Sequence, residues 1–393
     1  EYSLSSQTTT NGELQRRAGF AFNKNGATTT ISSGGSYRRG DFRADVQGQV
    51  SRALSTTEDM PFGFFTMLRS APISNLNLRW SRNAQDDPAF NLTQLSGPDW
   101  RDVWNSPAPA TPVLRFGPTH GKEDRLTAKA DFRYDRQLGG VPVLLKWGGD
   151  IGQQTRETQE HGTFNITYLG ADGISNTADD GVPIEPYRLR NLAGGNLQDV
   201  PMPDRFALAK IYGANPERFT RPTDAQFLQR SLTTRNKVRE QVDSLYQQTV
   251  IKVSKKFTLA PGVRFERTRS TGAGTTDRGD PYAKTRLTGN PTANIPTNTV
   301  EYVTARYGST LVNDSDYSTW LKYLHATYRH SDALIFRASF NNSITRPDLN
   351  NLSGGVAINE LDFPPTARIP NSSLKPESGR NFFASAEYYF PKG

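Results

Sequence analysis

The sequence has 393 residues, of which 35% are hydrophobic and 10% aromatic, and its 47 basic and 39 acidic residues give a net charge of +8. It contains no cysteine, which excludes disulfide bonds and cysteine-based zinc or iron–sulfur sites. No apolar run reaches the roughly eighteen residues of a transmembrane helix, but a membrane-spanning strand needs only about ten residues of alternating polarity. The basic residues are spread along the chain rather than clustered, so no nucleic-acid partner is expected.

Alternating strands are the dominant pattern along the chain. A hairpin turn is predicted first at Asn11-Gly12, between two polar stretches. In residues 42–50, apolar or small side chains then alternate with Arg, Asp and Gln. The same period of two recurs in residues 126–134, 334–340 and 382–390. This period predicts antiparallel sheet with one apolar and one wet face.

The composition of the two strand faces favours a membrane barrel over a soluble sandwich. Ala and Gly are frequent in mid-strand on the apolar face, and aromatic residues lie near strand ends. A lipid-facing surface tolerates small residues and carries aromatic girdles, whereas a sandwich core is filled by large branched side chains. We therefore expect an all-β, antiparallel transmembrane β-barrel, with about twelve to fourteen strands recognisable by pattern.

The predicted connections alternate between short and long. The short ones are residues 135–142, 254–256 and 329–332, and the long ones are 83–123, 155–240 and 270–316. Long structureless loops are uncommon in compact soluble domains, but outer-membrane barrels have short periplasmic turns and long extracellular loops. Within the longest loop, residues 204–212 and 224–232 can each form a short helix.

One acidic loop has the composition of a calcium site. Asp172, Asn176, Asp179 and Asp180 supply hard oxygen donors in a Gly-rich stretch, which is the ligand type that calcium prefers. The spacing does not match an EF-hand. A solvated, turn-rich extracellular loop would have the same composition, so both interpretations stay open.

Other chemistries have little support in the sequence. His325 and His330 lie five residues apart and would point to opposite faces of a strand, so no histidine metal site or other cofactor is predicted. No Gly-x-Ser-x-Gly motif or complete nucleotide-binding fingerprint is present, so the chain is not expected to be an enzyme. Trp100 and Trp104 lie in a long loop and can either stack on a flat ligand such as a sugar or pack inside the loop.

Several short motifs occur in the second half of the chain. They are Gly262-Val-Arg-Phe-Glu-Arg-Thr268, Trp320-Leu321, Ile344-Thr-Arg-Pro-Asp-Leu-Asn-Asn-Leu-Ser353, Leu374-Lys-Pro-Glu-Ser378 and Glu387-Tyr-Tyr-Phe390. In these motifs residues 240–390 resemble the barrel of TonB-dependent outer-membrane receptors, with Lys322 in place of a usual proline. Residues 1–240 agree with that family in strand pattern only.

The resemblance implies a 22-stranded barrel with a plugged lumen. The plug, the TonB box and the last strands are not in this sequence, so residues 1–393 are expected to be a fragment of the barrel domain. The resemblance further implies a Gram-negative outer-membrane receptor. Such a receptor takes up a scarce nutrient, energised by the inner-membrane TonB complex through the missing N-terminal region. Its ligand, a small molecule, glycan or peptide, is not identified. A passive porin and a soluble glycan-binding or adhesin module are the alternatives.

Two motif elements are expected to lie close together at the extracellular ends of neighbouring strands. Proline cannot donate to a sheet ladder, so Pro347 and Pro376 should mark where regular pairing stops. The family-motif residues are Arg346, Pro347, Asp348, Leu374, Lys375, Pro376 and Glu377. The four charged side chains among them are expected to pair and hold the base of the loop against the lumen wall.

Overall fold

The computed structural model divides the chain into two compact units. The first comprises residues 1–25, 56–120 and 160–231, and the second comprises residues 26–55, 121–159 and 232–393. The residues described are 5–15, 17–18, 23–59, 63–69, 73–84, 86–87, 91–99, 113–160, 164–175, 177, 179–183, 203–351, 354–360, 362–371 and 373–390. Each unit is considered by itself below.

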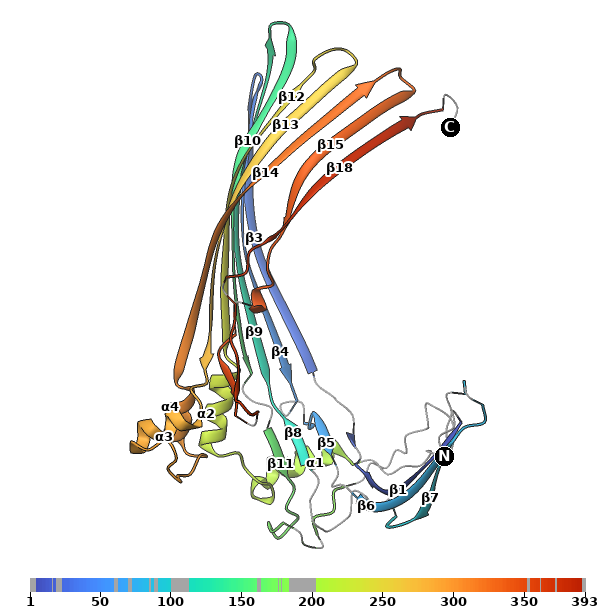
Figure 1. Ribbon diagram of the computed structural model, residues 1–393, viewed down its shortest axis with the longest axis vertical. Coiled ribbons are helices and arrows are strands. Elements are labelled where there is room, and N and C mark those ends of the chain that lie inside the picture. Colours follow the sequence, from blue (N-terminus) through green and yellow to red (C-terminus); the bar gives the residue numbers. More distant parts are fainter. Residues whose placement is uncertain are drawn as a thin grey trace. The chain divides into compact units, whose positions relative to one another are not determined.

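The second unit is built on one curved sheet of nine strands (Figure 1). In spatial order they are β18 (Glu377–Tyr388), β15 (Leu334–Thr345), β14 (Ser309–Arg329), β13 (Phe257–Thr276), β12 (Asn236–Ile251), β10 (Val141–Glu160), β9 (Thr119–Leu138), β4 (Phe42–Glu58) and β3 (Asn23–Arg39). The pairs from β10 to β18 are antiparallel with continuous registers. The predicted antiparallel strands at 42–50, 126–134, 334–340 and 382–390 are therefore confirmed. All but the last lie inside the observed strands, and the last runs two residues past the end of β18.

Alternation along the strands separates the sheet into two faces of opposite character. On one face, register aligns Leu245 with Phe265 and Phe265 with Trp320; Leu245 and Trp320 are exposed, and Phe265 is half-buried between them. On the other face, Tyr246 aligns with Arg264. We call these the apolar face and the polar face. Toward the loop end, the apolar face becomes charged.

Short turns connect the strands at one end of this sheet, as predicted. Gly139 and Gly140 both have positive φ, 57° and 80°, which is the backbone of a type I′ hairpin turn and favours glycine at both positions. Gly40, with φ 56°, turns β3 into β4. The β12–β13 and β14–β15 connections are also only a few residues long.

The opposite end of the sheet carries structured loops. Between β13 and β14 lie two helices, α3 (Asp280–Thr288) and α4 (Val300–Tyr307). Between β15 and β18 lie a 3₁₀ turn, η4 (Leu349–Asn351), and a small hairpin of β16 (Ala357–Asn359) with β17 (Thr366–Arg368). The sequence had predicted only a long loop over residues 270–316, so these two helices are an addition.

The first unit consists of two small sheets and helices around their own apolar core. One sheet has the order β1 (Ser6–Leu14), β6 (Ile73–Ser81), β7 (Asn91–Ser96), and the other β11 (Phe164–Thr167), β8 (Val113–Phe116), β5 (Met67–Arg69), β2 (Arg17–Ala18). The helices are α1 (Arg205–Ala214), η3 (Pro216–Arg218) and α2 (Asp224–Thr233). Phe65, Leu68, Leu76, Leu114, Ile166, Leu208 and Phe219 are buried in the core.

Both helices predicted in the longest loop are confirmed. Asp204 caps α1 by accepting hydrogen bonds from the backbone N–H groups of Phe206 and Ala207, at 3.0 and 2.9 Å. Such a cap satisfies donors that the first helical turn leaves unpaired. Within the described part of the chain, no helix is long and apolar enough to cross a membrane.

Two sequence predictions differ from the structure. Asn11-Gly12 is not a hairpin turn: it lies within β1, which pairs with β6, and Asn11 takes up its positive φ of 51° in a bulge between Thr9 and Gly12. The pattern predicted twelve to fourteen strands along the chain, whereas the described residues form 18, of which nine make up the continuous sheet. Its strands are long, up to the 21 residues of β14, and the remaining strands belong to small separate sheets.

Candidate functional site

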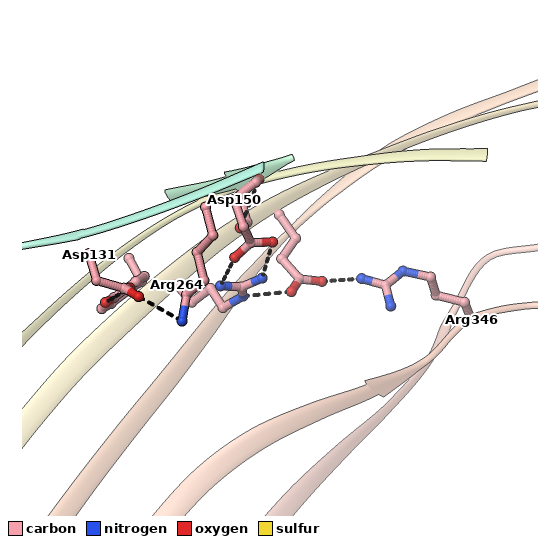
Figure 2. Close-up of polar contacts among 8 residues, drawn as sticks. Asp131, Asp150, Arg264 and Arg346 are labelled. Carbon is pink, nitrogen blue, oxygen red and sulfur yellow. Dashed lines mark hydrogen bonds and ion pairs between the residues drawn. The ribbon is translucent and has the colours of Figure 1, made fainter. Parts of the chain in front are cut away.

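Polar and charged side chains on the polar face form a network across the four neighbouring strands β9, β10, β12 and β13 and the residue that follows β15 (Figure 2). We call it the polar ladder, and its members are Lys129, Asp131, Asp150, Tyr246, Arg264, Glu266 and Arg346. Strand alternation brings these residues to the same face. Three of its side chains are cationic and three are anionic, so its charge is balanced.

Arg264 is the centre of the ladder. Its Nη1 and Nη2 atoms donate to the two carboxylate oxygens of Asp150 at 2.9 and 3.2 Å, across the intervening strand β12. Its Nε donates to Glu266, two residues along β13, at 2.6 Å. The guanidinium fork suits such a bidentate contact, which a lysine could not make. Arg264 therefore ties β10 to β13.

Arg346 extends the ladder to the loop after β15. Its Nη2 donates to the second carboxylate oxygen of Glu266, and its Nε donates to the hydroxyl of Thr268 at 3.3 Å. The Glu266 side chain is only 10% exposed and lies between two guanidinium groups, whereas Arg346 is 32% exposed. The first residue of this loop is thus held against the wall formed by β13.

Tyr246 and Lys129 complete the ladder at its other end. The Tyr246 hydroxyl donates to Asp131, and Lys129 forms an ion pair with the same carboxylate at 2.8 Å. The tyrosine reaches β9 by passing over Gly148 of β10. A Cβ atom at Gly148 would lie 3.0 Å from the tyrosine ring and 2.3 Å from the carbonyl oxygen of Ala130. The absence of a side chain at Gly148 therefore lets the Tyr246 ring cross β10 and reach Asp131.

The Gly262–Thr268 motif has a clear geometric role. Its even-numbered residues face the ladder, and Val263 and Phe265 face the apolar side. A Cβ atom at Gly262 would lie 2.1 Å from the Tyr323 ring, which occupies the space above this glycine. The motif thus supplies Gly262, which leaves space for the Tyr323 ring, and Arg264 and Glu266, the two central charges of the ladder.

The motif elements at the loop roots do meet, as predicted. Thr345 is the direct partner of Glu377 in the β15–β18 register, and regular pairing stops there, next to Pro347 and Pro376. Arg346 and Glu377 lie one chain step off a paired position, so their Cα atoms are at most about 9 Å apart. The charge pairing differs from the prediction, because the ion pair of Arg346 is with Glu266. Asp348 follows Arg346, and Leu374, Lys375 and Pro376 lead directly into β18.

A second polar cluster joins the two loops of this unit, and we call it the loop latch. Arg306 of α4 donates to both carboxylate oxygens of Asp277, at 2.8 and 3.0 Å, and forms an ion pair with Glu360 at 3.1 Å. Glu360 also accepts the backbone N–H of Asp280 at 2.5 Å. Glu360 belongs to the β15–β18 loop, so the latch fastens that loop to the helical one.

A tyrosine and an aspartate stabilise the helical side of the latch. The Tyr302 hydroxyl donates to Asp280 at 2.5 Å, and Lys284 pairs with the same carboxylate at 2.8 Å. Burial and then the bond to Asp280 raise the pKa of Tyr302 to about 12. Burial alone would raise the pKa of Asp280, but the contacts from Lys284 and Tyr302 hold it below its ordinary value.

The carboxylates of the acidic loop are engaged by the loop itself. Asp179 accepts hydrogen bonds from the Thr177 hydroxyl at 2.7 Å and from the backbone N–H groups of Ala171 and Asp172 at 2.5 and 3.1 Å. These bonds hold the pKa of Asp179 below its ordinary value. Asp172 caps the backbone N–H of Ile174 at 2.8 Å, and Asp180 accepts that of Thr177 at 3.2 Å.

Two of the sequence-based binding hypotheses remain predictions. Asn176 lies outside the described residues, and in the rest of the described chain no group of three or more His, Asp or Glu side chains is placed to hold a metal. Trp100 and Trp104 also lie outside the described residues. His325 contacts the hydroxyl of Thr327 at 3.1 Å.

The polar ladder is suited to lining a hydrated passage. Its charges are already paired within the wall, and its more exposed pairs, such as Lys129 with Asp131, contribute only about 0–1 kcal/mol each. They can therefore exchange partners with a segment or solute in the lumen at small cost. Sequence reasoning identified Arg346 and the motif around Arg264, but it did not identify Asp150 as the partner of Arg264 or the contact between Tyr246 and Asp131.

Comparison with known families decides what kind of wall this is. Residues 63–393, most of the chain, match the family described as "TonB dependent receptor-like, beta-barrel". The chain belongs to the TonB-dependent receptors. Members of this family lie in the outer membrane of Gram-negative bacteria and are transporters rather than enzymes. The apolar face of the sheet is therefore the lipid-facing side, and the polar ladder lies on the lumen side.

Most of this chain is similar to part of several solved receptor structures. The ferric-catecholate import receptor Fiu from E. coli K12, in its closed form, has 10% identity and a TM-score of 0.39, over 90% of this chain and 39% of that one. The siderophore receptor PiuA from Acinetobacter baumannii has 11% identity and a TM-score of 0.35, over 98% and 52%. The FrpB iron transporter from Neisseria meningitidis, as apoprotein, has 14% identity and a TM-score of 0.31, over 94% and 42%.

This receptor barrel spans about half or less of the length of those structures. No curated protein matches the chain in sequence. Family membership confirms the predicted fold class, the outer-membrane location and the assignment as a non-enzyme. It also excludes the soluble glycan-binding or adhesin alternative.

Proposed function

We propose that this chain forms part of the barrel wall of a receptor that imports a scarce extracellular nutrient across the outer membrane. Transport is energised by the inner-membrane TonB complex, acting on a region N-terminal to the barrel. Outer-membrane lipid surrounds the apolar face. The imported ligand is a small molecule, a glycan or a peptide, and the barrel uses no cofactor and binds no nucleic acid.

The observation that carries this proposal is the continuity between the lumen wall and the extracellular loops. Arg346 is the last polar contact of the wall and also the first residue of the β15–β18 loop. A simple pore needs only a polar lining. A receptor also needs loops that hold a defined position above the lumen, and the contact between Arg346 and Glu266 supplies this at the loop base.

The charge balance of the ladder supports a lumen that is filled by a movable segment. Unpaired charges on the wall would bind a plug tightly and resist its displacement, because separating a desolvated ion pair costs several kcal/mol. Arg264 and Asp150 already form an ion pair with each other, so neither needs an oppositely charged side chain from the plug. The wall can then release a plug under a modest pulling force.

Energy dependence is the measurement that tests the proposal. The receptor is expressed from its complete reading frame in a strain with an intact TonB complex and in a strain lacking it, and growth is measured on limiting nutrients supplied one at a time. We expect at least one nutrient to support growth only when both the receptor and the complex are present. Growth that is independent of the complex would refute energised uptake.

Passive permeation separates a receptor from a porin. The same receptor is reconstituted into liposomes, and swelling in an isotonic monosaccharide solution is recorded. A plugged receptor should give no swelling above that of empty liposomes. Rapid swelling together with energy-independent growth would instead establish a porin.

A further inference from the structure

A cluster of aromatic rings lies on the apolar face near the short turns of β3, β4, β9 and β10. The Phe42 ring centroid lies 6.3 Å from those of both Phe132 and Trp147, and the latter two rings are stacked at 5.6 Å. Tyr37 lies 6.5 Å from Phe42 and is 54% exposed. Exposed aromatic side chains of membrane barrels gather at the depth of the lipid headgroups.

Arg136 is fixed beside this cluster. Its guanidinium lies over the Tyr134 ring, 5.0 Å from the centroid, and its Nε donates to the Tyr134 hydroxyl at 2.5 Å. Tyr134 and Arg136 alternate with Arg133 along β9, so Arg136 is on the apolar face and Arg133 is on the polar face. The Nη groups of Arg136 remain available to an anion.

Arg39 is placed on the same face by the β3–β4 hairpin. The side-chain contacts of Ser36 with Asp45, at 2.5 Å, and of Thr30 with Ser51, at 3.2 Å, fix the hairpin register. In that register Arg39 lies opposite Phe42, and residues opposite each other share a face.

No ion pair found among the described residues involves either Arg39 or Arg136, whereas Arg133 pairs with Asp135 at 2.9 Å. The two arginines are carried by strands on either side of β4, with backbones about 10 Å apart. Two arginine side chains span that distance around a single phosphate group. Guanidinium groups bind phosphate with paired, charge-assisted hydrogen bonds.

An apolar groove crosses the same face further from the turns. It has a volume of about 840 Å³, and its floor is made by Gly48, Ala128, Ala130 and Gly149. Leu245 forms one side and lies close over Gly149. Ala130 is six residues from Arg136 along β9, about 20 Å of strand, so a lipid acyl chain that starts near Arg136 reaches the groove.

We propose that this surface is a binding site for one anionic phospholipid of the periplasmic leaflet. Arg39 and Arg136 hold its phosphate, the aromatic cluster supports the glycerol region, and one acyl chain lies in the groove. The short turns of outer-membrane barrels lie on the periplasmic side, which selects this leaflet. Two cations that form no ion pair within the described part of the chain favour a lipid with net negative charge over a zwitterionic one.

Native mass spectrometry of the detergent-purified receptor, made from its complete reading frame, tests the site. The probes are phosphatidylglycerol and phosphatidylcholine with identical acyl chains. We expect phosphatidylglycerol to be retained preferentially, and Arg39→Gln/Arg136→Gln to weaken its binding roughly tenfold or more. Arg39→Lys/Arg136→Lys keeps the charge but not the paired hydrogen bonds, so its binding should lie between that of the wild type and that of the Gln variant, which shows that the loss in the Gln variant is not caused by misfolding.

The matched control is Arg38→Gln/Arg133→Gln, which removes the same charge at the same end of the strands from the opposite face. This control should bind phosphatidylglycerol like the wild type. A third variant, Ala128→Phe, fills the groove and should weaken both lipids together. The proposal is overturned if Arg39→Gln/Arg136→Gln binds like the wild type, if the control loses as much, or if phosphatidylcholine competes equally.

Discussion

The most informative perturbation is Arg346→Gln, which removes the charge that joins the loop base to the wall. Glutamine keeps a hydrogen-bonding side chain of intermediate length, so the main loss is the ion pair with Glu266. Glu266 retains Arg264 as a partner at 2.6 Å and is not left as an isolated charge. The variant should therefore loosen the loop without unfolding the barrel.

The size of the effect follows from exposure. Fully exposed ion pairs contribute about 0–1 kcal/mol, and loss of one partner from a buried pair costs about 3–5 kcal/mol. The Glu266 side chain is 10% exposed and the Arg346 side chain 32% exposed, so the pair lies between these limits. With Arg264 still in place, we expect about 1–2 kcal/mol, which corresponds to a 5–30-fold change in the local opening equilibrium.

Hydrogen exchange of the complete receptor in detergent measures this opening directly. In Arg346→Gln, backbone amides in residues 346–376 should exchange faster by about that factor, with smaller changes in β13. Arg337→Gln is the matched control, because Arg337 lies on β15, which Arg346 directly follows, and pairs with Glu387 at 2.8 Å near the short turns. It should leave residues 346–376 unchanged.

A double-mutant cycle with Glu266→Gln separates the pair from indirect effects. If the two side chains interact as the structure shows, the double variant should open little more than either single one, with a coupling of about 1 kcal/mol. Two results would refute the reasoning: additive effects, or faster exchange of residues 346–376 in Arg337→Gln than in Arg346→Gln.

Three further predictions concern individual contacts. Gly262→Ala should destabilise the barrel by about 1–3 kcal/mol in denaturant unfolding, because the added methyl would lie 2.1 Å from the Tyr323 ring. Gly152→Ala is the control and should be neutral, because no atom lies within 4 Å of its added methyl. Because the pKa of Tyr302 is raised, its neutral form stabilises the loop fully below pH 10, and this stabilisation is lost between pH 10 and about 12. Unfolding midpoints measured across this pH range should show that step in the wild type and not in Tyr302→Phe. Asp59 is 1% exposed and accepts hydrogen bonds from the Thr66 hydroxyl and the backbone N–H of Gly117. Asp59→Ala should therefore destabilise the first unit by about 1–3 kcal/mol, measured as faster limited proteolysis, and Asp59→Asn should destabilise it less.

Strand alternation made the sheet predictable, because each strand carries its own signal. Residues 126–134 alternate strictly, and the structure places them inside β9, which runs from residue 119 to residue 138. On either side of this segment, residues 122–125 and 135–136 are charged on both faces, so the apolar–polar alternation is not visible there. Barrel strands that project beyond the membrane are therefore underestimated in length by pattern alone.

The helices α3 and α4 were missed for a different reason. They are only 9 and 8 residues long, and their local sequence has weak helical periodicity. Their end signals are present: Thr299 caps α4 by accepting the N–H of Tyr302, and Gly289 ends α3 with a positive φ of 76°. Caps mark helix ends, but the stability of such short helices comes from tertiary contacts such as those of the loop latch.

The partners within the polar ladder could not be predicted from sequence because they skip a strand. Asp150 and Arg264 are 114 residues apart and lie on strands separated by β12. Their contact depends on the register of two strand pairs at once, and a shift of one residue in either pair would move a side chain to the other face. The sequence shows which residues face the lumen, but only the register shows which of them meet.

Contacts at several points hold the β15–β18 loop, and the side-chain contacts among them reach β13 and the α3–α4 loop that follows it. At its base, Arg346 contacts Glu266 within the strand, and in mid-loop, Glu360 contacts Arg306 and the N–H of Asp280, which follow β13. A loop held at only one point could swing freely about it. Because Glu360 is bound to Arg306 and to the N–H of Asp280, this loop and the α3–α4 loop must move together or break these contacts. Ligand contact with either loop would then bias the position of both, because the contacts of Glu360 join the two loops directly.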